Sequence, residues 1–145
     1  MRRNRVAILH GVNLDALGRR PAQHYGELTF ERLEMRIGEY AKEVDLEARF
    51  FQTNHEGEFV EELHKATDYA DALLLNPGAW THYAWSLRDA VELAGLPAVE
   101  VHLSDVKHRE PFRALSVLEA VCVASVSGQG VDGYRVALER LKEAL

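Results

Sequence analysis

Five short apolar runs recur along this chain of 145 residues, and amphipathic stretches lie between them. Apolar runs of this length, several of them rich in Val or Ile, are typical of buried strands. The stretches between them repeat apolar residues every three to four positions, the spacing of a helix that packs on one side. Such alternation predicts a parallel sheet with helices on both faces, and we expect a flavodoxin-like α/β fold with five strands. The expected strands are residues 6–9, 46–51, 72–75, 98–101 and 120–126.

The composition fits a single domain that spans residues 1–145. Hydrophobic residues make up 47% of the chain and charged residues 28%, which is enough to bury a core and to exclude wholesale disorder. The 23 acidic residues outnumber the 17 Lys and Arg residues and leave a net charge of -6, which disfavours nucleic acid as a partner. No apolar run approaches the ~20 residues of a membrane span, and the one cysteine, Cys122, cannot form an internal disulfide. We therefore expect a cytoplasmic protein with no membrane partner.

Polar side chains follow four of the expected strands, where each strand ends. His10 and Asn13 follow the first strand, residues 52–57 the second, Asn76 the third, and His102 and Ser104 the fourth. The carboxyl ends of parallel strands meet at one edge of the sheet, where ligands of open α/β folds bind. Core packing explains such a set of polar groups poorly, because each group buried in a core would need its own hydrogen-bond partner. The sequence therefore predicts a binding site at this edge, formed by segments 10–13, 52–57, 76–78 and 100–105.

A long connection, residues 14–26, follows the first expected strand and holds Arg19, Arg20 and Tyr25. Connections of this length often act as lids or binding loops, so we expect a flexible active-site loop. A phenol has an ordinary pKa near 10 and is a weak base unless a nearby cation favours the phenolate. Arg19 or Arg20 can supply that cation and make Tyr25 a general base. The alternative is a mobile surface loop whose arginines are merely solvated.

His102, at the end of the fourth strand, and Asn76, at the end of the third, each have two interpretations. Glu100 lies two residues before His102 and so projects from the same side of the strand, where it can fix the tautomer of the ring. His102 is then a general acid. Alternatively, it donates a hydrogen bond to a backbone carbonyl. Asn76 either caps the following helix or donates a hydrogen bond to a developing oxyanion.

His82 is expected near the start of the third helix. The free N–H groups of a helix start attract anions, and the ring can bind a carboxylate or a hydroxyl there. Arg109 and Arg113 are four residues apart and would share one face of a helix. They either contact the ligand or form ordinary ion pairs with Glu110 or Glu119.

Other kinds of site find little support in the sequence. His102 and His108 do not follow a metal-ligand spacing, and Cys122, in an apolar run, is expected to pack in the core. Gly128 and Gly130 form only part of the GxGxxG phosphate-binding pattern. No lysine stands at a strand end to form a Schiff base. We expect chemistry without a metal or an organic cofactor.

A set of short motifs covers nearly the whole chain: Gly11-Val12-Asn13-Leu14, residues 18–26, Asn54-His55-Glu56-Gly57, Asn76-Pro77-Gly78-Ala79, Thr81-His82, Leu87-Arg88-Asp89-Ala90, Glu100-Val101-His102, Arg109-Glu110 with Phe112-Arg113, and Gly130 with Gly133-Tyr134. In their order these motifs resemble the type II 3-dehydroquinate dehydratases, also called type II dehydroquinases. The resemblance implies a flavodoxin-like subunit that catalyses the reversible anti elimination of water from 3-dehydroquinate, giving 3-dehydroshikimate through an enolate. It also implies a place in the shikimate pathway to the aromatic amino acids, no metal or organic cofactor, and a homododecamer of four trimers.

The same resemblance implies a role for each site residue. Tyr25 as a phenolate removes the proton alpha to the ketone, supported by Arg20 and organised by Asn13. His102, oriented by Glu100, protonates the departing hydroxyl. An ordered water helps an amide to stabilise the enolate. The residues implied to contact the substrate are Asn76, which supplies that amide, His82, Asp89 and Arg113, with the backbone of Leu103 and Ser104.

This chain departs from the family pattern at several positions around the expected site. Val12 replaces a usual Pro, Pro21 follows the loop arginine in place of an acidic residue, and Trp80 replaces a smaller or different residue. Asp105 and Lys107 replace Asn and His, and the lysine can neutralise the carboxylate. We expect these departures to affect substrate affinity and the pH optimum rather than the type of reaction.

Two other classes of protein fit the same fold. A phosphoreceiver module would need a carboxylate at the end of the third strand to accept phosphate, and Asn76 occupies that position. A homologue could instead keep the fold and bind a small molecule with altered or lost turnover. An absorbance assay for the enone product distinguishes these alternatives.

Overall fold

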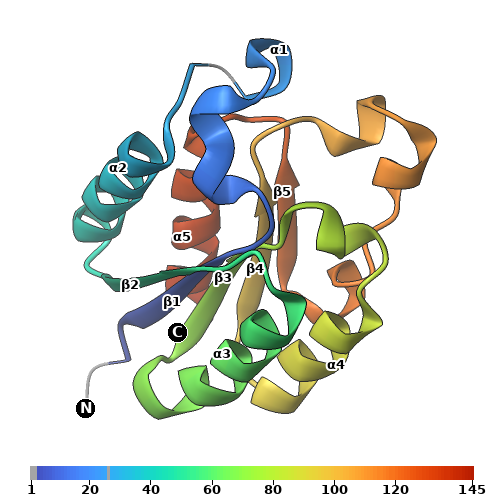
Figure 1. Cartoon of the computed structure of the whole chain (residues 1–145). Coiled ribbons are helices and arrows are strands. Elements are labelled where there is room, and N and C mark those ends of the chain that lie inside the picture. The colour runs from blue at the N-terminus through green and yellow to red at the C-terminus, as the bar shows by residue number, and fades with distance from the viewer. Residues whose placement is uncertain (1–2, 26) are drawn as a thin grey trace.

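The structure is a computed structural model that describes residues 3–25 and 27–145, with only the backbone of Tyr25. Five strands form a parallel sheet in the order β2-β1-β3-β4-β5 (Figure 1). This order is that of flavodoxin-like folds, so the expected α/β class and five-stranded parallel sheet are confirmed. The strands are β1 Arg5–His10, β2 Glu47–Gln52, β3 Ala72–Asn76, β4 Ala98–His102 and β5 Ala124–Ser127.

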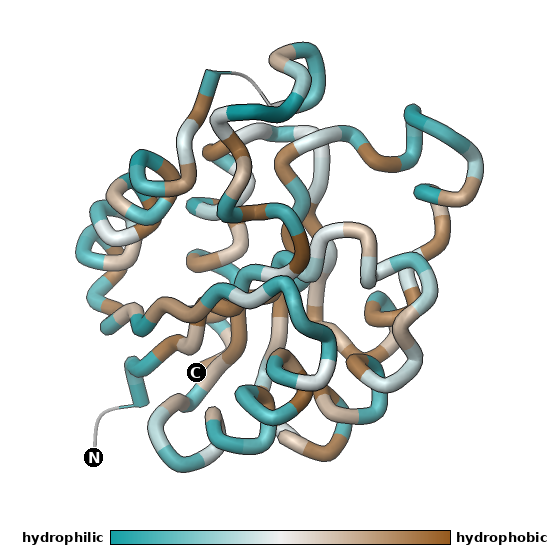
Figure 2. The backbone as a smooth tube through the Cα atoms, viewed as in Figure 1, coloured by the Kyte–Doolittle hydropathy of each residue, from teal (hydrophilic) through white to brown (hydrophobic). Residues whose placement is uncertain are grey.

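Helices cover both faces of the sheet. α2 and α5 pack on one face, and α3 and α4 pack on the other (Figure 1). Hydrophobic and hydrophilic residues alternate along these helices, as one-sided packing requires (Figure 2). None of the helices in the described part of the chain is long and apolar enough to cross a membrane. The helices are α1 Ala22–Tyr25, α2 Phe30–Glu43, α3 Glu56–Tyr69, α4 Trp85–Ala94 and α5 Asp132–Ala144.

Two inner strands, β3 and β4, are buried along their whole length. Every residue of β3 and β4 is buried, whereas β2 and β5 at the edges are partly exposed. A fully buried strand has a continuous apolar sequence, which explains why apolar runs located these strands.

The predicted start of the fifth strand is wrong. Glu119–Val121 form a 3₁₀ turn, and β5 begins only at Ala124. The hydroxyl of Ser116 accepts hydrogen bonds from the backbone N–H groups of Leu118 and Glu119, which favours a turn over an extended chain. Cys122 lies between the turn and the strand, half-buried against the apolar cluster under α3 and α4.

Two turns at the carboxyl edge of the sheet pack backbone against backbone. A Cβ atom at Gly11 would lie 2.4 Å from the carbonyl oxygen of Pro77. A Cβ atom at Gly78, where φ is +66°, would lie 2.7 Å from the carbonyl oxygen of Val12. Only glycine tolerates such an approach. The contact joins the segments that follow β1 and β3, and each segment carries an expected site residue.

The segment 14–26 begins as a 3₁₀ helix, Leu14–Arg19, and ends in the short helix α1. Leu14 and Leu17 are buried in the core, so the first half of the segment is anchored to the sheet. That this segment is a flexible active-site loop stays a prediction. That residues 1–145 form a single domain also stays a prediction.

Candidate active site

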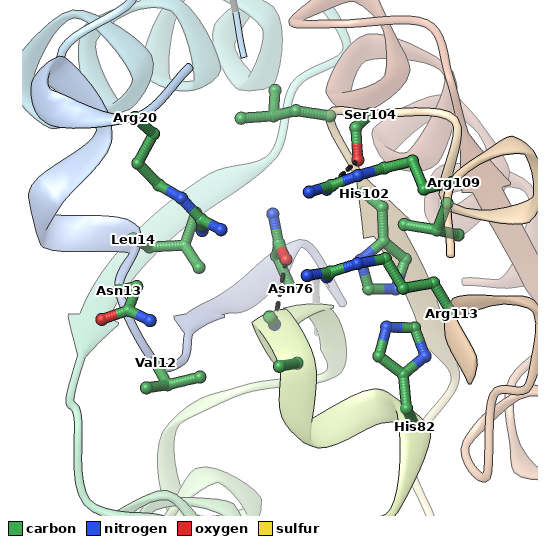
Figure 3. Close-up of a pocket in the computed structure, with 14 residues that line it drawn as sticks. Val12, Asn13, Leu14, Arg20, Asn76, His82, His102, Ser104, Arg109 and Arg113 are labelled. Carbon is green, nitrogen blue, oxygen red and sulfur yellow. Dashed lines mark hydrogen bonds between the residues drawn. The ribbon is translucent and has the colours of Figure 1, made fainter. Parts of the chain in front are cut away.

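A pocket opens at the carboxyl edge of the sheet, where the sequence predicts a binding site (Figure 3). Its walls come from the segments that follow β1 and β3, from the end of β4 and from the turns after β4. Most of the residues implied by the family resemblance lie here. The lining residues are Val12, Asn13, Leu14, Arg20, Asn76, Gly78, Ala79, His82, His102, Leu103, Ser104, Val106, Arg109 and Arg113.

Glu100 and His102 form a hydrogen-bonded pair on one face of β4. Nε2 of His102 lies 2.6 Å from Oε2 of Glu100, and the ring and the carboxylate are almost fully buried. A carboxylate only accepts, so Nε2 carries the proton of this bond. Nε2 of His102 therefore donates its hydrogen bond to a carboxylate. The alternative, that this nitrogen donates to a backbone carbonyl, is wrong.

Two hydroxyl groups complete the environment of the Glu100 carboxylate. Ser116 donates to Oε1 at 2.6 Å, and Thr81 donates to Oε2. Burial raises the pKa of Glu100, but the hydrogen bonds that its carboxylate accepts, led by the one from His102, outweigh burial and hold the pKa below its ordinary value. Glu100 is thus an ionised carboxylate enclosed by donors.

The side chain of Asn76 is held at both ends of its amide. Its Oδ1 accepts a hydrogen bond of 3.2 Å from the backbone N–H of Gly78, at the start of the following turn. Its Nδ2 donates a hydrogen bond of 2.8 Å to the hydroxyl of Tyr134. Because an amide nitrogen has two hydrogens, one N–H remains for a ligand in the pocket.

The expected place of His82 at a helix start is wrong. It ends the 3₁₀ turn Gly78–His82, and α4 begins only at Trp85. The turn forms because Gly78 has a positive φ, which bends the chain directly after β3. No helix N-terminus therefore acts on His82, although its ring does line the pocket.

Burial and neighbouring cations keep the His82 ring neutral. Nδ1 donates to the carbonyl oxygen of Leu115 at 2.7 Å, which leaves Nε2 as an acceptor. Burial lowers the pKa of His82, and nearby His102 and Arg113 lower it further. The rings of His82 and His102 lie nearly parallel, with centroids 6.5 Å apart. The pocket thus holds two imidazoles side by side.

Three arginines, Arg20, Arg109 and Arg113, line the pocket from separate segments, and their guanidinium groups point into the same space (Figure 3). None of the lining residues, all of which the structure describes, is acidic. Guanidinium groups bind carboxylates through paired hydrogen bonds, so the pocket suits an anionic ligand.

The helical face expected to carry Arg109 and Arg113 does not exist. The chain forms two separate 3₁₀ turns, Val106–His108 and Pro111–Ala114, and Arg109 lies between them. Arg113 pairs with Glu110 at 3.1 Å, and Arg109 donates to the hydroxyl of Ser104 at 3.2 Å. Arg113 therefore forms the expected ion pair and also lines the pocket, while its contact with a ligand stays a prediction.

Asn54 holds the first turn of the pocket in place, a contact that sequence reasoning missed. Asn13 has a positive φ of 69°, and its backbone N–H donates to Oδ1 of Asn54 at 2.8 Å. Nδ2 of Asn54 donates in turn to Asp15 at 3.1 Å. One hint of this role was present in the sequence, because Asn54 lies in segment 52–57, which is expected to form part of the binding site.

Two expected site residues that the structure describes, Glu100 and Asp89, do not line the pocket of this chain. Asp89 is exposed on α4. Tyr25 ends α1, and its side chain lies outside the described part of the structure. Within the described residues no group of three or more His, Cys, Asp or Glu side chains could hold a metal ion.

Comparison with known proteins agrees with the geometry. Residues 4–142 match the protein family described as "Dehydroquinase class II". A 3-dehydroquinate dehydratase of Pelotomaculum thermopropionicum is 46% identical over 134 residues, 92% of this chain and 93% of the relative. One of Thermotoga petrophila is 44% identical over 141 residues, 97% of this chain and 96% of the relative.

Solved structures agree as well. The crystal structure of the type II dehydroquinase from Butyrivibrio crossotus superimposes with a TM-score of 0.92 at 38% identity, covering 95% of this chain and 97% of that one. The type II dehydroquinase from Propionibacterium acnes gives a TM-score of 0.90 at 36% identity, covering 99% and 98%. Since the match extends over both sequence and fold, this chain belongs to the class II dehydroquinase family.

Proposed function

We propose that this dehydroquinase removes water from 3-dehydroquinate to give 3-dehydroshikimate, with anti geometry and through an enolate. The observation that carries the proposal is the ring of His102, which lines a pocket with three arginines and no acidic residue and is held from outside that pocket by Glu100. A ring held by a carboxylate suits a general acid, and the arginines suit an anionic substrate. The relatives named 3-dehydroquinate dehydratase support the same substrate.

In the first step a phenolate at Tyr25 takes the proton alpha to the ketone. The electron pair of the broken C–H bond moves to the carbonyl oxygen and forms the enolate. Arg20 lines the pocket and supplies the cation that favours the phenolate. Asn13 organises the two side chains. The role of Tyr25 rests on the family resemblance and on the place of Arg20, five residues earlier in the sequence, in the pocket wall.

In the second step the enolate collapses, a C=C bond forms, and the hydroxyl on the neighbouring carbon leaves with a proton from His102. Nε2 of His102 is bonded to Glu100, so Nδ1 is the nitrogen left to deliver that proton. The carboxylate stabilises the positively charged ring before the transfer. The free N–H of Asn76, together with an ordered water, stabilises the enolate oxygen.

Arg113, His82 and the backbone of Leu103 and Ser104 bind the carboxylate and hydroxyls of the substrate in this proposal. Asp89 is exposed on α4 and does not line the pocket of its own chain. A contact between Asp89 and the substrate therefore has to come from a second copy of the chain.

We expect a homododecamer of four trimers. Sedimentation should show a species far larger than the 16.4 kDa of one chain. A fully active monomer would contradict both the assembly and the role of Asp89.

We expect the protein to act in the cytoplasm, in the shikimate pathway, and without a metal or organic cofactor. Dialysis against EDTA should leave the rate unchanged. Borohydride added with substrate should not inactivate the protein, because no lysine imine takes part. Inactivation by borohydride would point to a Schiff-base mechanism instead.

The direct test is to incubate the purified chain with 3-dehydroquinate and follow the absorbance of the enone. His102→Ala should lower kcat by ~10²–10⁴-fold, the contribution of a positioned general acid. His64→Ala, an exposed histidine on α3, is the matched control and should keep the wild-type rate. Binding of substrate without formation of the enone would contradict the proposal and favour a homologue with lost turnover.

A further inference from the structure

A buried polar chain lies behind Asn76 and takes no part in the proposed reaction. The hydroxyl of Tyr134 accepts from Nδ2 of Asn76 at 2.8 Å and lies 3.0 Å from Nε2 of His10. Tyr134 comes from α5, and His10 ends β1 directly beside Asn76 in the sheet. Tyr134 and His10 have an exposed fraction of 0%, and neither lines the pocket.

Burial keeps both titratable groups of this chain in their neutral forms. Burial raises the pKa of Tyr134, so its phenol keeps its proton. Burial lowers the pKa of His10 to about 3, so its ring is neutral. The phenol oxygen already accepts from Asn76, and its own proton can go to an unprotonated Nε2 of His10.

The two ends of the Asn76 amide are therefore held by different partners. Oδ1 faces the N–H of Gly78, and Nδ2 faces the hydroxyl of Tyr134. A flipped amide would set its N–H groups against the N–H of Gly78, with no acceptor between them. Buried donors left without an acceptor cost about 1–3 kcal/mol, so the observed orientation is favoured.

We propose that Tyr134 is a positioning residue for the dehydration. Its hydroxyl holds the amide of Asn76 so that the second N–H points to the oxygen that becomes the enolate, and His10 holds the hydroxyl in turn. The inference rests on the proposed function, because the enolate is the group that this N–H stabilises. An oxyanion donor acts only when its direction is fixed before the charge forms.

Tyr134→Phe tests the inference because it keeps the buried ring and removes only the hydroxyl. We expect kcat to fall at least ~10-fold, toward the ~10²-fold loss typical of a missing oxyanion donor. We expect KM to change less than about threefold, because the contact matters mainly in the transition state. Tyr40→Phe is the matched control. Tyr40 is also buried, its hydroxyl bonds Arg36 and Asp132, and its loss should leave kcat unchanged.

A double substitution separates positioning from a general structural role. If Tyr134 acts through Asn76, adding Tyr134→Phe to Asn76→Ala should lower kcat no further. A further loss of the same size as in the wild-type background would overturn the inference. An unchanged kcat in Tyr134→Phe alone would overturn it as well.

A second variant covers the case in which Tyr134→Phe does not fold. His10→Leu removes the hydrogen-bond partner of the phenol hydroxyl, and we expect kcat to fall at least ~3-fold with little change in KM, in line with loss of a transition-state contact. An unchanged kcat in this variant would then reject the positioning role. An inactive wild-type protein would instead reject the proposed function, and this inference with it.

Discussion

The carboxylate of Glu100 lies 2.6 Å from Nε2 of His102, two residues further along β4. Alternate residues of a strand share one face, so the spacing alone brings the two groups together. The hydroxyls of Ser116 and Thr81 enclose the same carboxylate. The result is an ionised group in the core whose strongest partner is the ring that lines the pocket.

Glu100→Gln should separate the charge of this carboxylate from its shape. Glutamine fills the same space but carries no charge that can stabilise a positively charged ring. We expect kcat to fall by ~10–10²-fold, less than for removal of the general acid itself, while KM stays within about threefold. Enone absorbance gives both constants, and circular dichroism checks the fold. A kcat within twofold of wild type would show that the charge of Glu100 has no part in catalysis.

Tyr25→Phe should leave the fold intact and remove nearly all turnover. The residue ends the short helix α1, whereas the residues that anchor this segment to the core are Leu14 and Leu17. Loss of a positioned base costs ~10²–10⁴-fold in rate, and more where nothing replaces it. The measurement is kcat together with the thermal unfolding midpoint, which should match that of wild type. Retention of the wild-type kcat would assign the base to another group.

The parts of the site that depend on local sequence patterns could be predicted from the sequence. Asn76 and His102 follow apolar runs, and parallel strands bring their carboxyl ends to one edge, so these residues could be placed without a structure. The pairing of Glu100 with His102 follows from strand periodicity in the same way.

Contacts between distant parts of the chain could not be predicted. Tyr134 reaches Asn76 across 58 residues, and Asn54 reaches Asn13 across 41. Each depends on how α5 or the end of β2 packs on the edge, which no local pattern encodes. His82 was misplaced because the turn at Gly78 delays the helix to Trp85.

Arg113→Lys should mainly weaken substrate binding. Lysine keeps the positive charge but lacks the planar fork that pairs with a carboxylate. We expect KM to rise ~10-fold, about 1.4 kcal/mol, with a smaller change in kcat. Arg135→Lys is the matched control, because Arg135 pairs with Glu139 on α5 and does not line the pocket. Equal KM values for the two variants would remove Arg113 from the binding site.

Asp105→Asn should have a small effect. The partner of Asp105 in the structure is His108, whose Nδ1 lies 2.5 Å from the carboxylate, rather than Lys107. Both side chains of this pair are largely exposed, and such surface pairs are worth about 1 kcal/mol or less. We therefore expect kcat/KM to change less than about tenfold, or ~1.4 kcal/mol. A loss of several hundredfold would place Asp105 among the catalytic residues.

His10 should make the stability of this protein sensitive to pH. Burial lowers its pKa to about 3 in the folded chain, against about 6.5 when the chain is unfolded. Above pH 6.5 both states are neutral at this residue, and it adds no pH dependence. Below pH 6.5 the unfolded chain binds a proton that the folded chain excludes until about pH 3. As the pH is lowered from 6.5 toward 3, the free energy of unfolding should therefore fall by up to roughly 1.4 kcal/mol per pH unit.

His10→Asn removes this titration, because asparagine does not ionise. Urea unfolding at pH 7.5, 6 and 5, at one protein concentration, should show a free energy of unfolding that falls less steeply for the variant than for wild type. His64→Asn, an exposed histidine on α3, should keep the wild-type slope. Equal slopes for His10→Asn and wild type would mean that the folded chain accepts a proton at His10, and the direction of the hydrogen bond from Tyr134 would then have to be reversed.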